Sequence, residues 1–415
     1  MRVMFLTPTG QLGGAESSLV DILASLRHAE PSWPLHLLAA SDGPLTGRVR
    51  SLGVTAEVLP FPPAIARLGE HGAAGSGGPG GTIRFAVQIA LGSASAVRYR
   101  TALDRAIDAF DPAVVHSNGL KMHVLGARGT GSSRRPGLVW HLHDYLGTRP
   151  MTTRLLRWHP APPATVVANS ASVAADATRA LANGTRVVTV RNGVDLDRFS
   201  ISGVRADLDA MSGLSEAPAN TVRVGLVATL ARWKGHGTFL EAVARLPPYL
   251  PVRAYIVGDA VYQTEGSQYS LDELRQLARA LGIADRVGFT GFVDTPEAAF
   301  RALHVVVHSS TAPEPFGLVI AEAMACGRAV IVSNAGGAAE IVTPGVDALV
   351  HAPGDAGQLS TEIAALVGDA DLRARIGGAA RATAERSFDR ARLATELIPI
   401  YRDAVERAGH CGAGR

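Results

Sequence analysis

The chain has 415 residues, of which 47% are hydrophobic and 19% are charged. At about 100–200 residues per domain, this length predicts two or three domains, each with its own core. Forty Lys and Arg against 37 Asp and Glu leave a net charge of +3, too balanced for a dedicated nucleic-acid binder, so we expect no nucleic-acid partner. Two cysteines, Cys326 and Cys411, exclude a disulfide framework, and their spacing fits no metal site.

The sequence predicts neither a signal peptide nor a membrane-spanning helix. Residues 1–8 form a short apolar run that ends at Pro8. No uncharged apolar stretch approaches the roughly 20 residues that a membrane span needs. We therefore expect a cytoplasmic protein, with peripheral contact to the inner face of a membrane as an open alternative.

Short β-branched runs alternate with helical patterns along the first half of the chain. The expected strands are Val3–Thr7, Leu35–Ala40, Val114–His116, Leu138–His143, Val166–Ala168 and Val187–Val190. Between the first two, Gly14–Arg27 places its apolar side chains on one helical face.

The second half repeats this alternation. Its expected strands are Val222–Ala228, Val252–Val257, Val287–Thr290, Val305–His308, Ala329–Val332 and Ala348–Val350. Such alternation predicts an α/β protein with two doubly wound parallel sheets. We expect domains at 1–200 and 201–388, joined near Phe199–Thr221, and a final helix at 389–408 that docks on either domain.

One segment, Gly69–Gly81 (GEHGAAGSGGPGG), is a loop by composition. It is either a tolerated insertion or a lid over a substrate site, because long loops in compact domains are often lids.

The most informative segment is Glu314–Glu322 (EPFGLVIAE), which directly follows an expected strand. Pro315 is typical of a helix start, so we expect free N–H groups in the next turn, from Phe316, Gly317 and Leu318. Donors at a positive helix end bind hydroxyls or an anion. The carboxylates of Glu314 and Glu322 are spaced to contact the same ligand, and a carboxylate suits the vicinal hydroxyls of a ribose.

This segment resembles the E-x7-E signature of retaining glycosyltransferases of the GT-B fold, especially glycosyltransferase family 4. Further segments similar to that family's motifs follow its order over nearly the whole chain. They are GGAE at 13–16, HLHDY at 141–145, RNGVDLDRF at 191–199, ARWKGH at 231–236, NAGGAAEIV at 334–342 and PGVDALVHAPGD at 344–355.

The resemblance implies two Rossmann-like domains facing a central cleft, with a nucleotide-diphosphate sugar held mainly by residues 201–388. It implies that the final helix packs back on the N-terminal domain. It also implies sugar transfer with retention of anomeric configuration, without a metal or another cofactor. The sequence agrees on the metal, because no Asp-x-Asp cluster follows a strand in a position to hold one.

Lys234 is the expected partner of the leaving diphosphate. It lies where a loop becomes a helix, so its ammonium and the helix dipole would act on the same charge. The family usually has Gly-Arg at the end of the preceding strand, where this chain has Ala228 and Thr229. Either Arg232 replaces the missing arginine, or Arg232 is exposed and Thr229 supplies a weaker hydroxyl contact.

Other donor contacts are expected by resemblance. Gly13 and Gly14 leave a strand and open a helix, where backbone N–H groups meet a phosphate, although a simple turn is the alternative. His143 would hydrogen-bond the donor sugar near the reacting carbon. Asn192 would shape the binding site or only begin a linker, and Phe292 would meet the base through backbone groups.

The acceptor is expected on the N-terminal domain, near Asn118, Lys121, Tyr145 and Arg149. Arg149, Arg154 and Arg157 make this edge basic. They are either solvated or attract an anionic acceptor, such as a lipid phosphate, or a membrane surface. The acceptor class therefore stays open between a saccharide, a lipid-linked molecule and a small metabolite.

Retention is compatible with two routes. Glu314 attacks the anomeric carbon, or it only positions the donor while the acceptor enters on the face that the diphosphate leaves. We favour the second, front-face route, with His143, Glu314 and Lys234 as the catalytic residues. The alternatives are a GT-B epimerase or phosphorylase and a non-catalytic nucleotide-sugar binder. A nicotinamide oxidoreductase is disfavoured, because GQLGG replaces the G-x-G-x-x-G loop.

Overall fold

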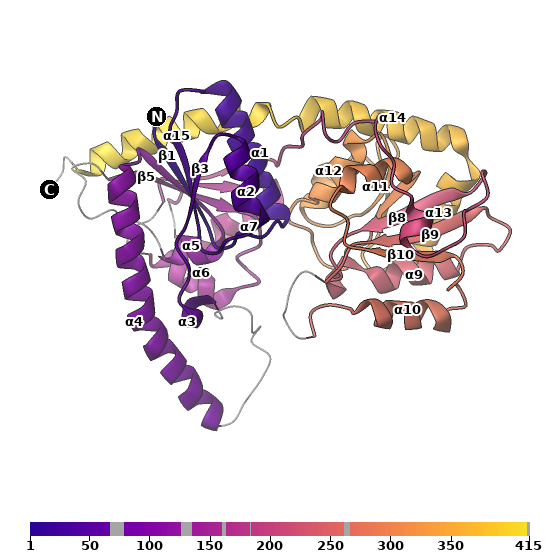
Figure 1. Ribbon diagram of the computed structural model, residues 1–415, viewed down its shortest axis with the longest axis horizontal. Coiled ribbons are helices and arrows are strands. Elements are labelled where there is room, and N and C mark those ends of the chain that lie inside the picture. The colour runs from indigo at the N-terminus through magenta and orange to yellow at the C-terminus, as the bar shows by residue number, and fades with distance from the viewer. Residues whose placement is uncertain (67–78, 126–134, 160–162, 183, 261–265, 413–415) are drawn as a thin grey trace. The chain divides into compact units, whose positions relative to one another are not determined.

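The computed structural model describes residues 1–66, 79–125, 135–159, 163–182, 184–260 and 266–412. It divides into two compact units, Met1–Gly193 with Arg390–Arg415, and Val194–Asp389. We call them the N-terminal and the C-terminal unit. Each is built around its own parallel sheet (Figure 1), as the strand–helix alternation predicted.

The N-terminal unit has a seven-stranded parallel sheet of order β3-β2-β1-β4-β5-β6-β7. The strands are β1 (Val3–Thr7), β2 (Leu35–Ala39), β3 (Thr55–Val58), β4 (Val114–Asn118), β5 (Gly137–Leu142), β6 (Thr165–Ala168) and β7 (Val187–Thr189). The order reverses between β1 and β4, because the chain first builds outward from β1 in one direction and then in the other.

Two helical layers cover this sheet. Alternate residues of β1 point to opposite faces: Val3 and Phe5 pack with α1, α2 and α15, and Met4 and Leu6 pack with α3, α4 and α5. The helices are α1 (Gly14–Ala29), α2 (Pro44–Ser51), α3 (Pro63–Ala66), α4 (Pro79–Phe110), α5 (Leu120–Leu125), α6 (Pro150–Arg157), α7 (Ala171–Ala180) and α15 (Arg392–Gly412).

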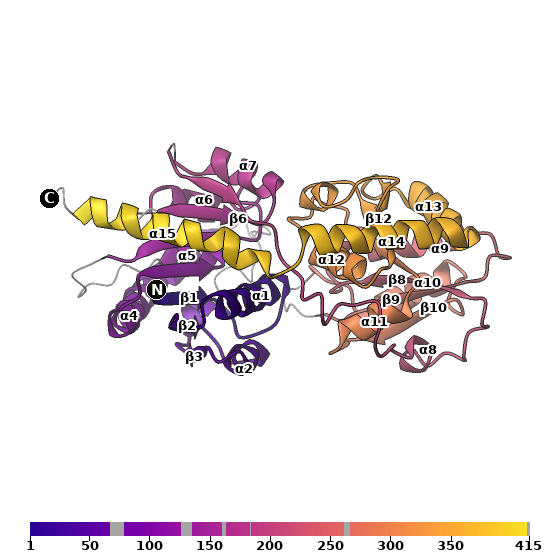
Figure 2. The ribbon, with the colours of Figure 1, turned by 90° about the horizontal axis from the view of Figure 1, so that it is seen from above.

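Helix α15 is the last element of the chain, yet it belongs to the N-terminal unit. It lies beside α1 (Figure 2), and its residues Leu393, Leu397, Tyr401 and Ala404 are almost completely buried. The final helix therefore completes one face of the first sheet.

The C-terminal unit has a six-stranded parallel sheet of order β10-β9-β8-β11-β12-β13, which reverses between β8 and β11. The strands are β8 (Val222–Val227), β9 (Val252–Val257), β10 (Val287–Gly291), β11 (Val305–His308), β12 (Ala329–Ser333) and β13 (Leu349–His351). Around them lie α8 (Leu208–Met211), η1 (Arg232–Lys234), α9 (His236–Ala244), α10 (Leu271–Ala280), α11 (Pro296–Ala302), α12 (Leu318–Ala325), η2 (Gly337–Glu340), α13 (Ala356–Gly368) and α14 (Ala370–Ser387).

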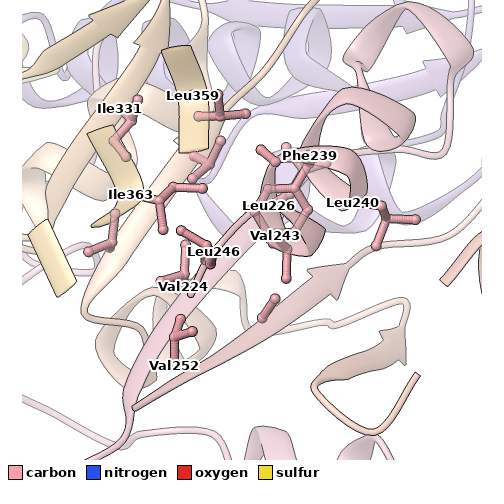
Figure 3. Packing of buried hydrophobic residues seen from close by; sticks show 14 of the residues in the cluster. Val224, Leu226, Phe239, Leu240, Val243, Leu246, Val252, Ile331, Leu359 and Ile363 are labelled. Atoms are coloured by element: carbon pink, nitrogen blue, oxygen red, sulfur yellow. The ribbon is translucent and has the colours of Figure 1, made fainter. Parts of the chain in front are cut away.

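The C-terminal core forms where α9 and α13 pack on one face of the second sheet. Figure 3 shows Val224 and Leu226 of β8 among Phe239 and Val243 of α9 and Ile363 of α13. All of these side chains are fully buried, so this sheet is a rigid base for the loops that follow its strands.

Apart from shifts of a few residues at strand ends and at the domain boundary, the structure differs from the sequence-based expectations in three places. Strand β3 was not predicted, because three of its four residues are exposed and it lacks an apolar run. The helix after Glu314 begins at Leu318, not at Pro315. Residues 69–78 of the glycine-rich segment lie outside the described residues, and residues 79–81 begin α4. Within the described ranges, no helix combines the length and the apolar character needed to cross a bilayer.

Candidate functional site

Each sheet has a switch point, where strand order reverses and the loops after two neighbouring strands run apart. In open α/β sheets, ligands bind there, beyond the carboxyl ends of the strands. In the C-terminal unit, the loop after β8 carries Lys234 and the loop after β11 carries Glu314. The topology therefore brings together two residues that lie 80 positions apart in the sequence.

Lys234 and Glu314 form a direct ion pair. The Lys234 Nζ donates to Glu314 Oε2 at 2.7 Å, and Glu314 is only 8% exposed. The ammonium also lies 4.0 Å from the centre of the Trp233 ring, which favours a cation through its π face. A partly buried cation is thus held at the switch point of the second sheet.

Two further side chains bind the same carboxylate oxygen. Ser310 Oγ donates to Glu314 Oε2 at 3.1 Å, and His308 Nε2 lies 3.2 Å from it. Because an ionised carboxylate only accepts hydrogen bonds, His308 must carry its proton on Nε2. Neither residue was predicted from the sequence, although their alternation at the end of an expected strand was a signal that both side chains share one face.

The loops that carry Lys234 and Glu314 are tied together by their backbones. Ser309 Oγ lies 3.1 Å from the carbonyl oxygens of Lys234 and Gly235, and Thr311 N–H donates to Trp233 O at 2.7 Å. Gly235 has φ +77°, and a Cβ there would lie 1.8 Å from Ser309 O. Only glycine fits this close approach, so the ion pair is part of a preformed loop structure.

These contacts determine the charge state of Glu314. Burial alone would raise the pKa of its carboxyl group, but the Lys234 ammonium and the hydrogen bond from His308 hold that pKa well below its usual range. Glu314 is therefore a carboxylate at neutral pH, and its Oε2 already accepts three hydrogen bonds.

The helix after Glu314 has its N-cap at Gly317, whose φ of +90° favours glycine. Phe316 is 2% exposed and its ring packs against Phe388, so its side chain belongs to the core. Leu318, the first residue of α12, is partly buried on the same core. Glu322 lies in the second turn of α12 and is partly buried.

The Arg232 side chain has three protein partners. Its guanidinium donates to Glu273 Oε1 at 2.7 Å and to Gly266 O at 3.1 Å, and it stacks over Tyr269. Thr229 follows β8 and is partly buried, and the ring of Phe292, after β10, is 62% exposed.

The switch point of the N-terminal sheet holds a second group of expected residues. Asn118 ends β4 and His143 follows β5, and His143 Nε2 lies 2.6 Å from Asn118 Oδ1. Asn118 Nδ2 donates to Ala15 O at 3.2 Å, which ties the pair to the start of α1. His143 and Asn118 were expected in separate roles, and the structure brings them into direct contact.

These contacts determine the tautomer of His143. Because Asn118 Nδ2 donates to a carbonyl, its Oδ1 is the atom that faces the histidine, and His143 Nε2 must be the donor. Burial lowers the pKa of His143 to about 4, so the ring is neutral. Its Nδ1 therefore carries a lone pair, which is buried and has no hydrogen-bond partner within the described part of the chain.

Gly13 and Gly14 lie where α1 begins. Gly13 is the N-cap of α1, and its N–H already donates to Glu16 Oε2 at 3.2 Å. Gly14 is exposed, and a Cβ built on it would have no atom within 4 Å. Of the two glycines, Gly14 leaves more room for a ligand to approach the backbone.

The other candidate residues of the N-terminal unit have protein partners. Asn192 is buried and accepts a hydrogen bond from Ser18 Oγ at 2.9 Å. Lys121 Nζ donates to Ala66 O at 2.6 Å, the Tyr145 hydroxyl bonds Ser172, and Arg149 pairs with Asp144 at 2.7 Å.

In the part of the chain that the structure describes, the cavities do not coincide with the Lys234–Glu314 pair. One of about 540 Å³ lies between α6 and α7, and one of about 380 Å³ lies beside α8, and neither is lined by Glu314 or His143. Chemistry and strand topology, rather than cavity volume, identify the candidate site. Among the described residues, no group of three or more His, Cys, Asp or Glu side chains is arranged to hold a metal ion.

Two family models match most of the chain between them. The model described as Glycosyltransferase Family 4 matches residues 12–198, and the one described as Glycosyl transferases group 1 matches residues 215–383. The candidate residues fall within these matched ranges.

Curated relatives are glycosyltransferases. A D-inositol 3-phosphate glycosyltransferase of Xylanimonas cellulosilytica is 32% identical over 227 residues, which are 54% of this chain and 52% of that protein. A GDP-mannose-dependent alpha-(1-6)-phosphatidylinositol monomannoside mannosyltransferase of Mycobacterium tuberculosis is 33% identical over 223 residues, 51% of this chain and 54% of that protein. The chain spans about half the length of the curated relatives it matches.

Solved structures match over nearly the full length. HepE of Anabaena, crystallised with UDP-glucose, has a TM-score of 0.77 and 28% identity, covering 96% of this chain and 99% of that one. WaaG, a glycosyltransferase of lipopolysaccharide biosynthesis, has a TM-score of 0.67 at 16% identity, covering 97% of this chain and 99% of that one, and shows the shared fold alone.

Proposed function

Because the chain belongs to the family 4 type of GT-B glycosyltransferases, we propose that it transfers a sugar from a nucleotide-diphosphate sugar to an acceptor hydroxyl. The observation that carries this proposal is the Lys234–Glu314 ion pair at the switch point of the second sheet. A relative that binds UDP-glucose with the same fold supports a nucleotide-sugar donor. The family resemblance predicted from the sequence is confirmed.

We assign the donor to the switch point of the C-terminal unit. Lys234 would neutralise the diphosphate as it leaves, together with the positive N-terminal end of α12 beyond Gly317. Glu314 would position the sugar and Glu322 would accept hydrogen bonds from ribose hydroxyls. Thr229 is the remaining hydroxyl contact to phosphate, and the backbone at Phe292 is assigned to the base.

We assign contacts with sugar and phosphate to His143 and Gly14 in the N-terminal unit. The neutral His143 ring would accept a hydrogen bond from a sugar hydroxyl at Nδ1, because Nε2 is committed to Asn118, and donor binding would have to expose this buried atom. At the start of α1, the phosphate contact falls mainly to Gly14, because the Gly13 N–H is bound to Glu16. Asn192 acts indirectly, by holding α1 through Ser18.

The proposed reaction retains the anomeric configuration by front-face displacement. The bond between the anomeric carbon and the diphosphate oxygen breaks while the acceptor oxygen bonds to the same face of that carbon. The leaving phosphate oxygen takes the acceptor proton, so no side chain need act as a strong base. Three hydrogen bonds to Glu314 Oε2 favour this route over a covalent glycosyl-Glu314. No metal or other cofactor is part of the proposal.

The acceptor is proposed as a saccharide, a lipid-linked molecule or a small metabolite. Curated relatives act on inositol phosphate and phosphatidylinositol mannoside by name, which supports a polyol or glycolipid hydroxyl. We place the reaction in the cytoplasm, with peripheral contact to the inner face of a membrane.

The test is a panel of UDP-, GDP- and ADP-sugars, measured by the rise in melting temperature and by nucleotide release with candidate acceptors. We expect one donor to raise the melting temperature and to be turned over. The product should keep the anomeric configuration of the donor by NMR, and the rate of sugar transfer should be the same with and without a chelator. Glu314→Gln should lower turnover about 100-fold or more, whereas Glu273→Gln should keep it within a few-fold.

Several results would overturn parts of this proposal. If no nucleotide-sugar binds or reacts, the function is wrong. Binding with neither transfer nor hydrolysis favours a non-catalytic binder, and release of an epimerised nucleotide-sugar favours an epimerase. Isolation of a peptide glycosylated at Glu314 would replace front-face displacement by the covalent route.

A further inference from the structure

Helix α6, Pro150–Arg157, has an exposed apolar face. Met151, Leu155 and Trp158 are 63%, 58% and 77% exposed. Their spacing of four and then three residues places them on one side of the helix. Leu156, on the other side, is 3% exposed and packs in the core with α7. Three large exposed apolar side chains on one side of a helix make this face a candidate interaction site.

A basic cavity adjoins this face. Arg154, Arg157 and Arg179 line the cavity of about 540 Å³ between α6 and α7, together with Trp158. Neither Arg154 nor Arg157 forms an ion pair with any side chain that the structure describes. We call Met151, Leu155 and Trp158 with these three arginines the α6 surface.

One carboxylate, that of Asp176, also lines the cavity, and it is largely committed to the backbone. Its Oδ2 accepts hydrogen bonds from Leu146 N–H at 2.6 Å and from Gly147 N–H at 3.0 Å. Its Oδ1 lies 3.8 Å from Arg179. The cavity therefore keeps an excess of positive charge, which favours an anionic ligand.

We propose that the α6 surface binds the face of an anionic lipid bilayer. Met151, Leu155 and Trp158 enter the boundary between headgroups and acyl chains, where tryptophan is favoured, and the arginines contact lipid phosphates. A helix of two turns with three apolar anchors provides weak, reversible attachment. A bilayer matches the observations better than a protein partner, because the apolar side chains project from a short helix beside cations.

This inference specifies the membrane contact included in the proposed function and gives that contact a surface. Vesicle binding requires no sugar donor and no acceptor, so a protein that transfers sugar without binding vesicles refutes the membrane contact and leaves the proposed transfer reaction standing. A protein that binds vesicles without transferring sugar refutes only the proposed activity.

The experiment uses the full chain and vesicles of phosphatidylcholine, with or without an equal part of phosphatidylglycerol. We expect co-sedimentation with the anionic vesicles at low salt, weakened by added salt, and roughly 100-fold weaker binding to phosphatidylcholine alone. Equal binding to both vesicles, or binding to neither, overturns the proposal.

Intrinsic fluorescence tests the location of the contact. Of the four tryptophans, Trp33 and Trp140 are buried, Trp233 is 38% exposed and Trp158 is 77% exposed. We expect a blue shift of emission on adding anionic vesicles that Trp158→Phe abolishes and Trp233→Phe retains. A shift that survives Trp158→Phe places the contact elsewhere and refutes the α6 surface.

Two sets of variants separate apolar from charged contributions. The apolar variant combines Met151→Ser, Leu155→Ser and Trp158→Ser, and the charge variant combines Arg154→Gln, Arg157→Gln and Arg179→Gln. Each triple variant should weaken anionic vesicle binding at least about ten-fold. Two double variants at exposed positions elsewhere serve as controls: Val204→Ser with Tyr249→Ser, and Arg279→Gln with Arg402→Gln. These controls should not weaken vesicle binding. An unchanged melting temperature shows that each variant is folded.

A final experiment tests whether the α6 surface binds a lipid surface or a soluble phosphate. If glycerol 3-phosphate alone raises the melting temperature and displaces the protein from vesicles, the cavity is a soluble-ligand site and the membrane proposal fails. We expect glycerol 3-phosphate to displace the protein from vesicles no more than sodium chloride does at the same ionic strength.

Discussion

Lys234 and Arg232 are two residues apart, but their side chains have different partners. Lys234 binds the buried carboxylate of Glu314, whereas Arg232 binds the exposed carboxylate of Glu273. The hydrogen bond that Arg232 donates to Glu273 raises the pKa of Arg232, and solvent screens this exposed pair. Substitutions of these two residues therefore remove different contacts.

We predict that Lys234→Gln lowers kcat/KM for the sugar donor about 100- to 1,000-fold, because it removes the charge that we propose neutralises the leaving diphosphate. Glutamine retains a hydrogen-bond donor toward Glu314. Arg232→Ala should change kcat/KM only a few-fold, because its guanidinium is engaged elsewhere. Steady-state kinetics of both variants decide this, and an equally large loss in Arg232→Ala would show that Arg232 replaces the family arginine.

For single residues, the sequence predicted which charged side chains lie in the candidate site better than it predicted which side chains they contact. Lys234 and Glu314 were both predicted, because a charged residue after a strand is visible in the sequence. Their direct contact depends on β8 lying next to β11, which no local pattern specifies. Phe316 was expected to meet a ligand through its backbone N–H, and the packing of its ring on Phe388 in the core was not predicted.

Four elements of the N-terminal unit are joined by buried histidines. His116 on β4 hydrogen-bonds Tyr401 on α15 and lies 3.3 Å from His141 on β5. His123 on α5 hydrogen-bonds Ser117 and His141 O. Burial lowers the pKa of His116 and of His123 to about 3, and that of His143 to about 4.

These lowered pKa values predict loss of stability in acid. Between about pH 6.5 and pH 4 the unfolded chain binds protons on these histidines and the folded chain does not, so stability falls as pH falls. Each histidine contributes a slope of about 1.4 kcal/mol per pH unit. Urea unfolding at several pH values should show His123→Gln with a shallower slope and the exposed His28→Gln unchanged. Equal slopes in all three proteins would contradict the buried neutral state.

Elements were predictable where hydrophobic runs were long. Eleven of the strands coincide closely with β-branched or apolar runs such as Val252–Val257, because strands buried on both faces must be apolar. Strand β7, Val187–Thr189, was found by the same signal despite its exposure. Strand β3 was missed for the opposite reason, since Thr55–Val58 lies at a sheet edge and is mostly exposed.

At the scale of the whole molecule, two sheets with separate cores predict two unfolding transitions. Tyr401 is fully buried in the core of the N-terminal unit, and Phe239 is fully buried in that of the C-terminal unit. Tyr401→Ala and Phe239→Ala should each cost about 3–5 kcal/mol, and each should lower only the transition of its own unit. Calorimetry with both variants tests this, and a joint shift would show that the units unfold as one.

The position of α15 has a consequence for how the protein is made on the ribosome. Domains usually fold in the order of their synthesis. Here the first sheet lacks one of its covering helices until residues beyond Arg390 have been translated, after all of Val194–Asp389 has emerged. The C-terminal unit is therefore the first to be complete. While it is being made, the N-terminal unit exposes the apolar surface that α15 later covers, and chaperones would bind at this stage.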